Sequence, residues 1–321
     1  MKQPRQHILR VALIGATLLL AGCDDLFQTV PPPAPPEPPV VAPPTEPVVV
    51  PPSETSRALA VYYRRLQSDL LTQGLLRGDG GGPDTPFTAA QLGRNFVRIA
   101  LFNEYRDDSD FRSPQATVSR LRRWEQPIRM SVEFGPSVPL EQRAMDETSV
   151  ASYAARLSRL TGVRITQTDQ SPNYYVLFWN EDDRRASVDR LREIIPGISD
   201  TSLRAILNLP RDQLCLVVGT FAPGGAQYQQ AVAIIRAEHP NLMRAACIHE
   251  ELAQGMGLAN DSPQARPSIF NDDEEFGLLT THDELLLRML YNPALQTGMR
   301  PNEAAPIARR LARQILAEGA S

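Results

Sequence analysis

The sequence predicts an α+β fold with a mixed sheet, and three observations indicate this class. Strand-like runs, alternating or continuously apolar, cluster between residues 127 and 238. Helical patterns dominate after Pro240. A proline-rich segment, residues 31–52, separates these elements from the N-terminus. We find no internal repeat, and the expected organisation is a tether, a helical N-terminal region and a main domain.

Residues 1–22 have the pattern of a bacterial lipoprotein signal peptide. Lys2, Arg5 and Arg10 form a positive start, and residues 11–20 form an apolar run too short to span a bilayer comfortably. The other interpretations are a secreted protein without lipid and an uncleaved signal anchor. The order of charge, apolar run and cleavage motif favours the lipoprotein.

The leader ends in the lipobox Leu20-Ala21-Gly22-Cys23. Cleavage before Cys23 would leave that residue to carry diacylglycerol and an amine-linked acyl chain, such as palmitate, which together anchor a protein stably. The expected location is the periplasmic side of the cell envelope. Asp24 favours the inner membrane under the rule of enteric bacteria, and the outer membrane stays open.

The charge of the chain argues against nucleic acid as a partner. Of its 33 Lys and Arg residues, three lie in the leader, so the mature chain would carry 30 against 37 Asp and Glu. An acidic chain is not attracted to polyanions. The basic run at Arg120–Arg123 is too short to change this expectation.

Residues 23–53 are expected to be the lipidated cysteine and a tether. Twelve of the 22 residues from Pro31 to Pro52 are proline. Such a segment prefers polyproline II, which extends by roughly 3.1 Å per residue. It would hold the globular part away from the lipid.

Residues 54–113 are expected to be a helical N-terminal region. Apolar residues recur near the 3.6-residue period between residues 53 and 77, and a second helix is predicted at residues 89–102. The glycine-rich run at residues 78–86 separates the two. We interpret both helices as an appendage to the main domain.

The main domain is expected at residues 114–321. We interpret the second and third of its strands as a pair joined around residues 169–173, and expect Thr281 and Glu284 to form a capping box. The predicted strands cover residues 127–135, 162–168, 173–181, 213–221 and 227–238. The predicted helices cover residues 149–160, 187–195, 200–207, 241–255, 278–293 and 303–317.

Two cysteines follow the anchor, and the periplasm is oxidising. Cys215 lies in a strand-like run and Cys247 on a predicted helix. We expect a disulfide between them, which would fix that helix to the sheet. The alternative is that Cys247 is a thiolate ligand, since it lies one turn before Glu250 and Glu251.

The run "CIHEELAQGMGLAND" carries the strongest chemical signal. His249-Glu250 resembles the start of H-E-x-x-H, but Ala253 replaces the second histidine. One residue later, Glu250 and Gln254 occupy the two ligand positions on one helix face, with Glu251 as the general base between them. Gly257 would let the chain turn, bringing a third ligand back. That ligand would be one of two residues, Asn260 or Asp261.

The long segment from Cys247 to Leu295, together with "RRWEQPIRMSVEFG" upstream, resembles a bacterial lipoprotein family catalogued as domain of unknown function 2927 (DUF2927). The resemblance covers residues 122–299. More distantly, the segment is similar to metzincin-type zinc peptidases, which implies a zincin-like, degenerate metzincin-type domain. "PSIF", ending at Phe270, stands where those enzymes place a methionine turn.

The residues themselves depart from a zinc site. Zinc prefers imidazole and thiolate, and a Gln amide is a poor ligand. Glu250, Gln254, Asn260 and Asp261 form an all-oxygen set, which suits calcium, magnesium or manganese. The plain alternative is a solvated helix face followed by a capped turn. The acidic run 271–275 lacks the spacing of an EF-hand and is interpreted as a surface loop.

Three functions follow, in order of expectation. The first is a non-catalytic or atypical lipoprotein that binds an envelope protein or peptide in the old active-site cleft. The second is a metal-dependent, peptidase-like hydrolase with Glu251 as base and a divalent ion as cofactor. In that case His249 or His282 could assist as ligand or acid. The third is a purely structural envelope lipoprotein.

Overall fold

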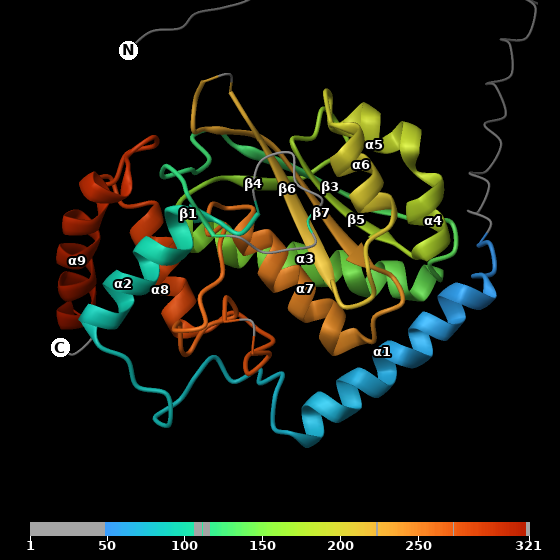
Figure 1. Cartoon of the computed structure of the whole chain (residues 1–321), viewed down its shortest axis with the longest axis horizontal. Helices are drawn as coiled ribbons and strands as arrows, with labels where there is room; N and C mark the ends of the chain where they lie inside the picture. The colour runs from blue at the N-terminus through green and yellow to red at the C-terminus, as the bar shows by residue number, and fades with distance from the viewer. Residues whose placement is uncertain (1–48, 106–110, 112–115, 223, 272, 319–321) are drawn as a thin grey trace, which may run out of the picture. The chain divides into compact units, whose positions relative to one another are not determined.

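The computed structural model describes most of the chain after the tether (Figure 1). The described residues are 49–105, 111, 116–222, 224–271 and 273–318. Residues 47–321 form one compact unit. The predicted signal peptide, Cys23 and most of the tether lie outside the described residues. No helix among the described residues is long and apolar enough to cross a bilayer.

Helices and strands alternate along the middle of the chain and give a mixed α+β architecture. The strands are β1 (Phe102–Asn103), β2 (Thr117–Val118), β3 (Ile128–Phe134), β4 (Ile165–Gln167), β5 (Tyr174–Trp179), β6 (Cys215–Phe221) and β7 (Tyr228–Arg236). The helices are α1 (Glu54–Thr72), α2 (Ala89–Ala100), α3 (Leu140–Thr161), α4 (Glu181–Ala186), α5 (Val188–Ile194), α6 (Asp200–Leu207), α7 (Asn241–Gln254), α8 (Thr281–Leu290) and α9 (Pro301–Glu318).

The main sheet has the strand order β4-β3-β5-β7-β6. The first four strands are parallel, and β6 runs antiparallel to β7 at the edge. The predicted mixed sheet is therefore confirmed. The predicted pairing of β4 with β5 is wrong, because both pair in parallel with β3, which lies between them. The short segment between β4 and β5 crosses the level of β3, where the backbone N–H groups of Thr168 and Asn173 donate to the carbonyl oxygens of Met130 and Arg129.

The two faces of the sheet are covered by different helices (Figure 1). Along β7, Ala231, Ala233 and Ile235 join the core cluster that includes α3 and α7, whereas Val232 and Ile234 face the cluster of α5 and α6. This alternation is the period of two expected of a strand buried on both faces. The result is a sheet between two helical layers, with β6 at one edge.

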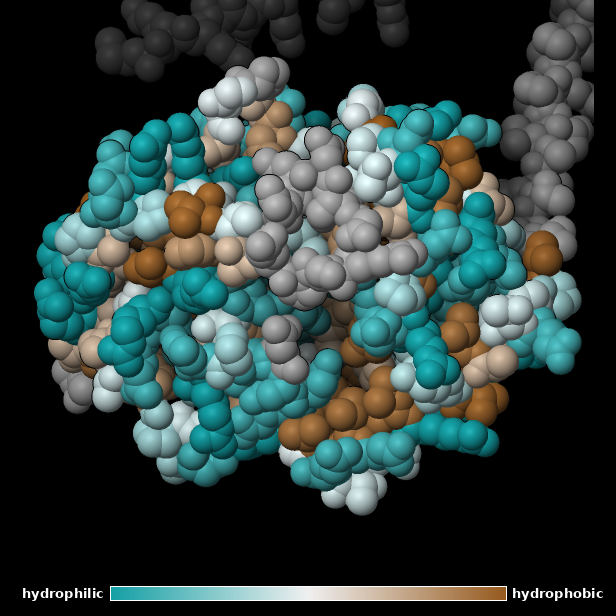
Figure 2. Space-filling view, viewed as in Figure 1, coloured by the Kyte–Doolittle hydropathy of each residue, from teal (hydrophilic) through white to brown (hydrophobic). Residues whose placement is uncertain are grey.

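The N-terminal helices belong to this unit in different ways. Helix α2 buries Leu92, Phe96 and Ile99 and packs against α8 and α9, so it lies inside the main core. Helix α1 packs Tyr63 against Met243 at the start of α7. Figure 2 shows apolar residues gathered near the junction of α1 and α7. The interpretation of α2 as an appendage is corrected by this packing.

Local capping differs from the prediction at two helices. The capping box of α8 is formed by Thr280 and Asp283, one residue earlier than expected for Thr281 and Glu284. The expected strand 173–181 ends at Trp179, because Asn180 caps the unpredicted helix α4. Asn side chains accept hydrogen bonds from the first helical N–H groups, which ends the extended conformation.

Candidate functional site

Helix α7 positions the motif residues through its apolar face. Met243, Cys247, Ile248 and Leu252 are buried along it, at a spacing that keeps them on one side of a helix. Glu250, Glu251 and Gln254 of the same helix line a cavity beside the edge strand β6. The motif residues therefore face the margin of the sheet and leave the core to the apolar side chains.

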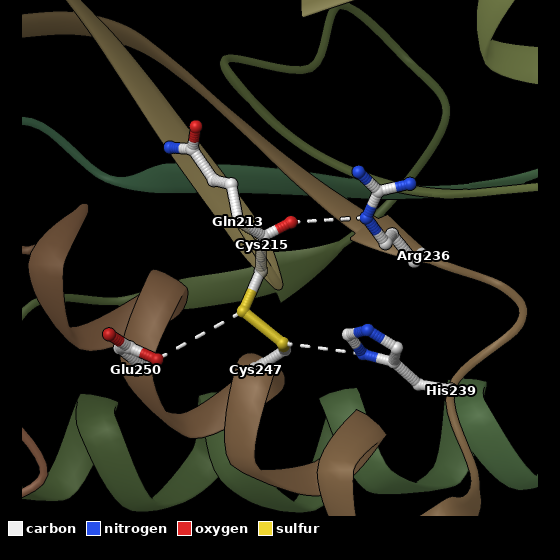
Figure 3. The surroundings of a disulfide bond; sticks show 6 residues. All are labelled: Gln213, Cys215, Arg236, His239, Cys247 and Glu250. Carbon is white, nitrogen blue, oxygen red and sulfur yellow. Dashed lines mark hydrogen bonds between the residues drawn. A yellow bond between two sulfur atoms is a disulfide. The ribbon is translucent and has the colours of Figure 1, made fainter. Parts of the chain in front are cut away.

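A disulfide joins α7 to β6, as predicted (Figure 3). Cys215 and Cys247 are bonded, with their Cα atoms 5.9 Å apart. The alternative in which Cys247 is a thiolate ligand is wrong, because its sulfur is in this bond. Glu250 extends toward the bridge, and its Oε2 lies 4.0 Å from Cys215 Sγ.

A cavity of about 310 Å³ lies between α7 and β6. Its polar lining brings together Glu250, Glu251, Gln254 and Asp261 from the motif. A second cavity of about 350 Å³ continues along β6 and shares Gln254 and Val217 with the first. These two cavities are called the β6 cleft below. The sequence pattern thus identified four residues that meet in one place.

Glu251 is the most unusual group of the β6 cleft. Its side chain is 3% exposed, and its Oε2 has no hydrogen-bond partner among the described residues. Burial raises the pKa of Glu251 well above its usual range, and the charges of Glu104 and Asp261 raise it further. A buried carboxylate without partners is costly, so the protonated form is favoured.

Glu250 is half-buried and lies beside Glu251 on the same helix. Burial raises the pKa of Glu250 well above its usual range, and the negative charge of Glu251 is the next cause. Asp261 adds a third negative charge and accepts a hydrogen bond from Gln254 Nε2 at 3.4 Å. Neighbouring carboxyl groups that cannot ionise together tend to share protons.

Three further carboxylates, Glu104, Asp212 and Glu274, line the cleft and were not assigned to the site by the sequence analysis. Glu104 follows β1, and its backbone N–H donates to the carbonyl of Ala259, which brings this distant segment to the end of α7. Glu274 comes from the acidic run 271–275. No local motif marks Glu104, since only a long-range backbone contact places it there.

The acidic run at residues 271–275 is in part a loop held by side-chain hydrogen bonds, in line with its interpretation as a surface loop. Glu275 accepts hydrogen bonds from Arg77 and Arg266, and Asp273 accepts one from Asn271. Residue 272 lies outside the described residues. Only Glu274 of this run lines the cavity beside Glu251.

Three candidate residues do not line the β6 cleft. His249 Nδ1 accepts the backbone N–H of Leu279 at 2.9 Å, and burial lowers the pKa of His249 to about 3. Asn260 is buried and donates its amide to the carbonyl oxygens of Arg98 and Asp261. His282 is fully buried at the start of α8 and does not line the cavity.

The end of α7 depends on two glycines. A Cβ at Gly255 would overlap the hydroxyl of Tyr174, and a Cβ at Gly257 would overlap the carbonyl oxygen of Arg122. Gly257 also has φ +120°, a conformation that other residues rarely adopt. The expected turn after the helix is therefore present, and it brings Asp261 back toward Gln254.

Residues 267–270, which stand in the position of the methionine turn, pack into the core. Phe270 is fully buried, and Ser268 donates to Asp283 Oδ1 at 2.6 Å. Asp283 also accepts the backbone N–H of Ile269. The loop is thus fixed from α8 and lies apart from the lining of the β6 cleft.

The side chains that line the β6 cleft do not form a set of ligands that fits zinc. Neither a histidine nor a thiolate among the described residues reaches the cavity, and the third position, Asn260, is committed elsewhere. Among the described residues, one group of three His, Cys, Asp or Glu side chains brings its ligand atoms within 4.8 Å of each other, namely Cys215, Glu250 and Glu251. The sulfur of Cys215 is oxidised, so two carboxylates are left.

A larger hollow lies elsewhere on the described surface. It has a volume of about 940 Å³ and is lined by β2 and by Arg120, Arg122 and Arg300. Arg122 is occupied by Asn103 and by the ring of Phe221, over which it lies at 3.9 Å from the centroid. The larger volume of this hollow is therefore not by itself a reason to prefer it over the β6 cleft as the binding site.

Comparison with known proteins gives a family and no described activity. No curated protein matches the chain. The model of one family, described as "Protein of unknown function (DUF2927)", matches residues 89–310, which is more than half of the chain. This range takes in α2 and the whole of the β6 cleft. The chain belongs to the DUF2927 family.

Proposed function

We propose that this protein is an envelope lipoprotein whose zincin-like domain binds a partner through the β6 cleft. The observation that carries the proposal is Glu251, which is buried in the cleft wall with an unpartnered carboxylate oxygen. A buried polar atom without a partner calls for an explanation, and a ligand that completes it is the explanation proposed for this one. Neighbouring carboxylates and the cavity along β6 give that ligand a place.

The arrangement of α7 and the sheet supports the zincin-like interpretation. A helix carrying the altered motif lies beside an antiparallel edge strand of an otherwise parallel sheet. Gly257 follows the spacing of the metzincin motif, and Asp261, one residue beyond the third ligand position, returns toward Gln254. The absence of histidine ligands from the described cleft favours binding over zinc-dependent catalysis.

The anchor is part of the proposal. Cleavage before Cys23 and acylation of its thiol would attach the chain to the membrane, and residues 31–52 would separate the cleft from the lipid. Asp24 favours the inner membrane. The partner would then be a protein or peptide of the periplasm or envelope.

Site-specific photo-crosslinking in living cells tests the binding function. A photoreactive amino acid at Val217, inside the β6 cleft, should give a discrete adduct. The matched control is the same amino acid at Leu71, which is 47% exposed on α1. Adducts from Leu71 with none from Val217 would contradict the proposal and favour a purely structural lipoprotein.

A metal-dependent hydrolase is the second candidate. One observation favours it: Glu250 and Glu251 place carboxylate oxygens within 4.8 Å of each other, close enough to share one hard divalent ion. Gln254 and Asp261 would be the remaining oxygen donors, and Glu251 the residue that takes a proton. Plasma mass spectrometry of protein purified without chelator tests this. Stoichiometric metal, lost in a Glu250→Ala, Gln254→Ala variant, would favour the hydrolase.

A further inference from the structure

The disulfide contains a sulfur that already lies beside two carboxyl groups. The sulfur of Cys215 and one oxygen each of Glu250 and Glu251 lie within 4.8 Å of one another. Glu250 extends toward this sulfur, and its Oε2 lies 4.0 Å away (Figure 3). In the disulfide the sulfur carries no negative charge, and the thiolate is the form of cysteine that binds metals. Reduction would therefore give the two carboxyl groups a third metal ligand as their neighbour.

One thiolate and two carboxylates form a set of ligands that zinc accepts. Calcium and magnesium take oxygen ligands, so a thiolate does not favour them. The carboxylate of Glu251, whose buried Oε2 accepts no hydrogen bond from the described residues, would gain the ion as a partner. Metal ligands must be deprotonated, so the ion would displace the protons that burial favours on Glu250 and Glu251.

The elements that carry these ligands are held in place by more than the disulfide. Strand β6 pairs with β7 along its whole length. Helix α7 buries Ile248 and Leu252 in the core cluster that also contains Ile235 of β7. Opening the bridge would therefore leave the sulfur on β6 close to the two carboxyl groups on α7.

The two sulfurs of the bridge have different surroundings. Cys215 lines the β6 cleft. Cys247 is only 2% exposed, and its Sγ lies 3.7 Å from His239 Nδ1 (Figure 3). A hydrogen bond in this contact needs the proton on Nδ1, because a disulfide sulfur has no hydrogen. The same N–H would stabilise a negative charge on Cys247 if the bridge opened.

Thiol–disulfide exchange accounts for every atom and electron of the opening. A thiolate of a dithiol attacks Cys215 Sγ, and the S–S electron pair leaves on Cys247. The second thiol of the reductant gives its proton to Cys247 and attacks its own sulfur in the mixed disulfide. The reductant closes its own disulfide, and Cys215 is released as a thiolate.

We propose that the disulfide between β6 and α7 is a redox switch on a zinc site. A dithiol reduces the bridge, and Cys215 then binds one zinc ion together with Glu250 and Glu251. Cys215 lies on β6, outside the helix motif, so these ligands are not those of the metzincins. The second candidate function uses oxygen donors of the oxidised protein instead. The inference is independent of any partner that the cleft binds.

Two single variants distinguish the proposed ligand from its bridge partner. Cys247→Ser leaves Cys215 as a free thiol, and Cys215→Ser removes the same bridge but leaves Cys247. We expect full-length Cys247→Ser, in detergent and without a reductant, to hold one zinc ion per chain by plasma mass spectrometry. Cys215→Ser and the oxidised wild type should bind zinc more weakly by roughly tenfold or more, since even groups that hydrogen-bond to a metal ligand contribute that much. Circular dichroism checks that both variants fold.

Cobalt in place of zinc reports the sulfur ligand directly, because a thiolate bound to cobalt gives a charge-transfer band in the near ultraviolet. The band should appear in Cys247→Ser and be absent from Cys215→Ser. Adding Glu250→Gln to Cys247→Ser should remove zinc binding. Adding Glu147→Gln, which removes an exposed carboxylate on α3, should leave it unchanged.

The wild type tests the switch without any substitution. Dithiothreitol under native conditions should reduce the bridge, shown by alkylation of Cys215 and Cys247 and mass spectrometry of their fragments. After removal of the reductant under argon, the protein should bind zinc. Reoxidation should release the ion.

Four results would each overturn the proposal. The first is a bridge that resists dithiothreitol until the protein unfolds, and the second is equal zinc binding by Cys215→Ser and Cys247→Ser. The third is no zinc in either Cys247→Ser or the reduced wild type. The fourth is equal metal binding by the oxidised and reduced wild type, which is the result expected of the second candidate function.

Discussion

The buried carboxyl group of Glu251 makes the stability of this protein depend on pH. In the folded state its pKa lies well above the usual range, chiefly because of burial. The folded protein therefore binds a proton that the unfolded chain releases near pH 4.5. Between that pH and the raised pKa, the free energy of unfolding falls as pH rises.

The first prediction follows from this sign. Glu251→Gln should raise the free energy of unfolding at pH 8 by about 1–2 kcal/mol, because the amide never ionises. At pH 4 the variant and the wild type should differ little. Urea unfolding at both pH values measures the effect, with Glu147→Gln as the exposed control. A variant that loses stability at pH 8 would show that Glu251 is a structural hydrogen-bond acceptor.

The sequence identified part of the site at the residue scale. Glu250, Glu251, Gln254 and Asp261 were expected together, because helix periodicity and the turn at Gly257 are local properties. Glu104 was not expected, since its position depends on a long-range backbone contact. The expected ligand Asn260 is committed to backbone carbonyls, which no spacing rule could show.

Among the elements, the link between β6 and α7 has the clearest consequence. The disulfide closes a loop with a sequence separation of 32 residues. Replacing both cysteines, Cys215→Ala and Cys247→Ala, should lower the free energy of unfolding by about 3–4 kcal/mol, chiefly by freeing the unfolded chain. Urea unfolding with and without a reductant measures this. The reductant should destabilise the wild type and leave the double variant unchanged; an equal effect on both would contradict the prediction.

The exit from α7 supports a third prediction. Gly257→Ala should destabilise the fold by about 3 kcal/mol or more, because it combines an unfavourable φ with overlap against the carbonyl of Arg122. Gly298 is the matched control, since it has φ +91° but open space around it. Gly298→Ala should cost only about 1 kcal/mol. Equal losses in thermal unfolding would show that the overlap is relieved by a small shift.

Element types were easier to predict than their pairing. The strands have the apolar patterns expected for a sheet, and the predicted strands at residues 213–221 and 227–238 are present as β6 and β7. The order of β4, β3 and β5 was missed, because parallel pairing joins segments far apart in sequence. Likewise, nothing local to α2 indicated that its apolar face packs against α8 and α9.

For the whole molecule, we expect the compact unit to bind and the proposed anchor to attach the chain to a membrane, as separate tasks. The unit that begins at residue 47 contains all three core clusters and the β6 cleft. The predicted lipid attachment at Cys23 lies outside the described residues. A cleft whose walls are set by the sheet and α7 needs no membrane contact for its geometry, so the tether would set only the location of binding.

The last prediction concerns that anchor. Wild-type cells fed radiolabelled palmitate should incorporate the label into the protein, and Cys23→Ala should abolish it, because the acylated thiol is removed. The Cys215→Ala, Cys247→Ala variant is the control, since it keeps Cys23 while losing the other two cysteines. Each buried methylene of an acyl chain contributes about 0.8 kcal/mol to membrane binding, so the acylated protein should also sediment with membranes. Wild-type protein that carries no label but still sediments with membranes would contradict the lipoprotein and leave an uncleaved signal anchor as the attachment.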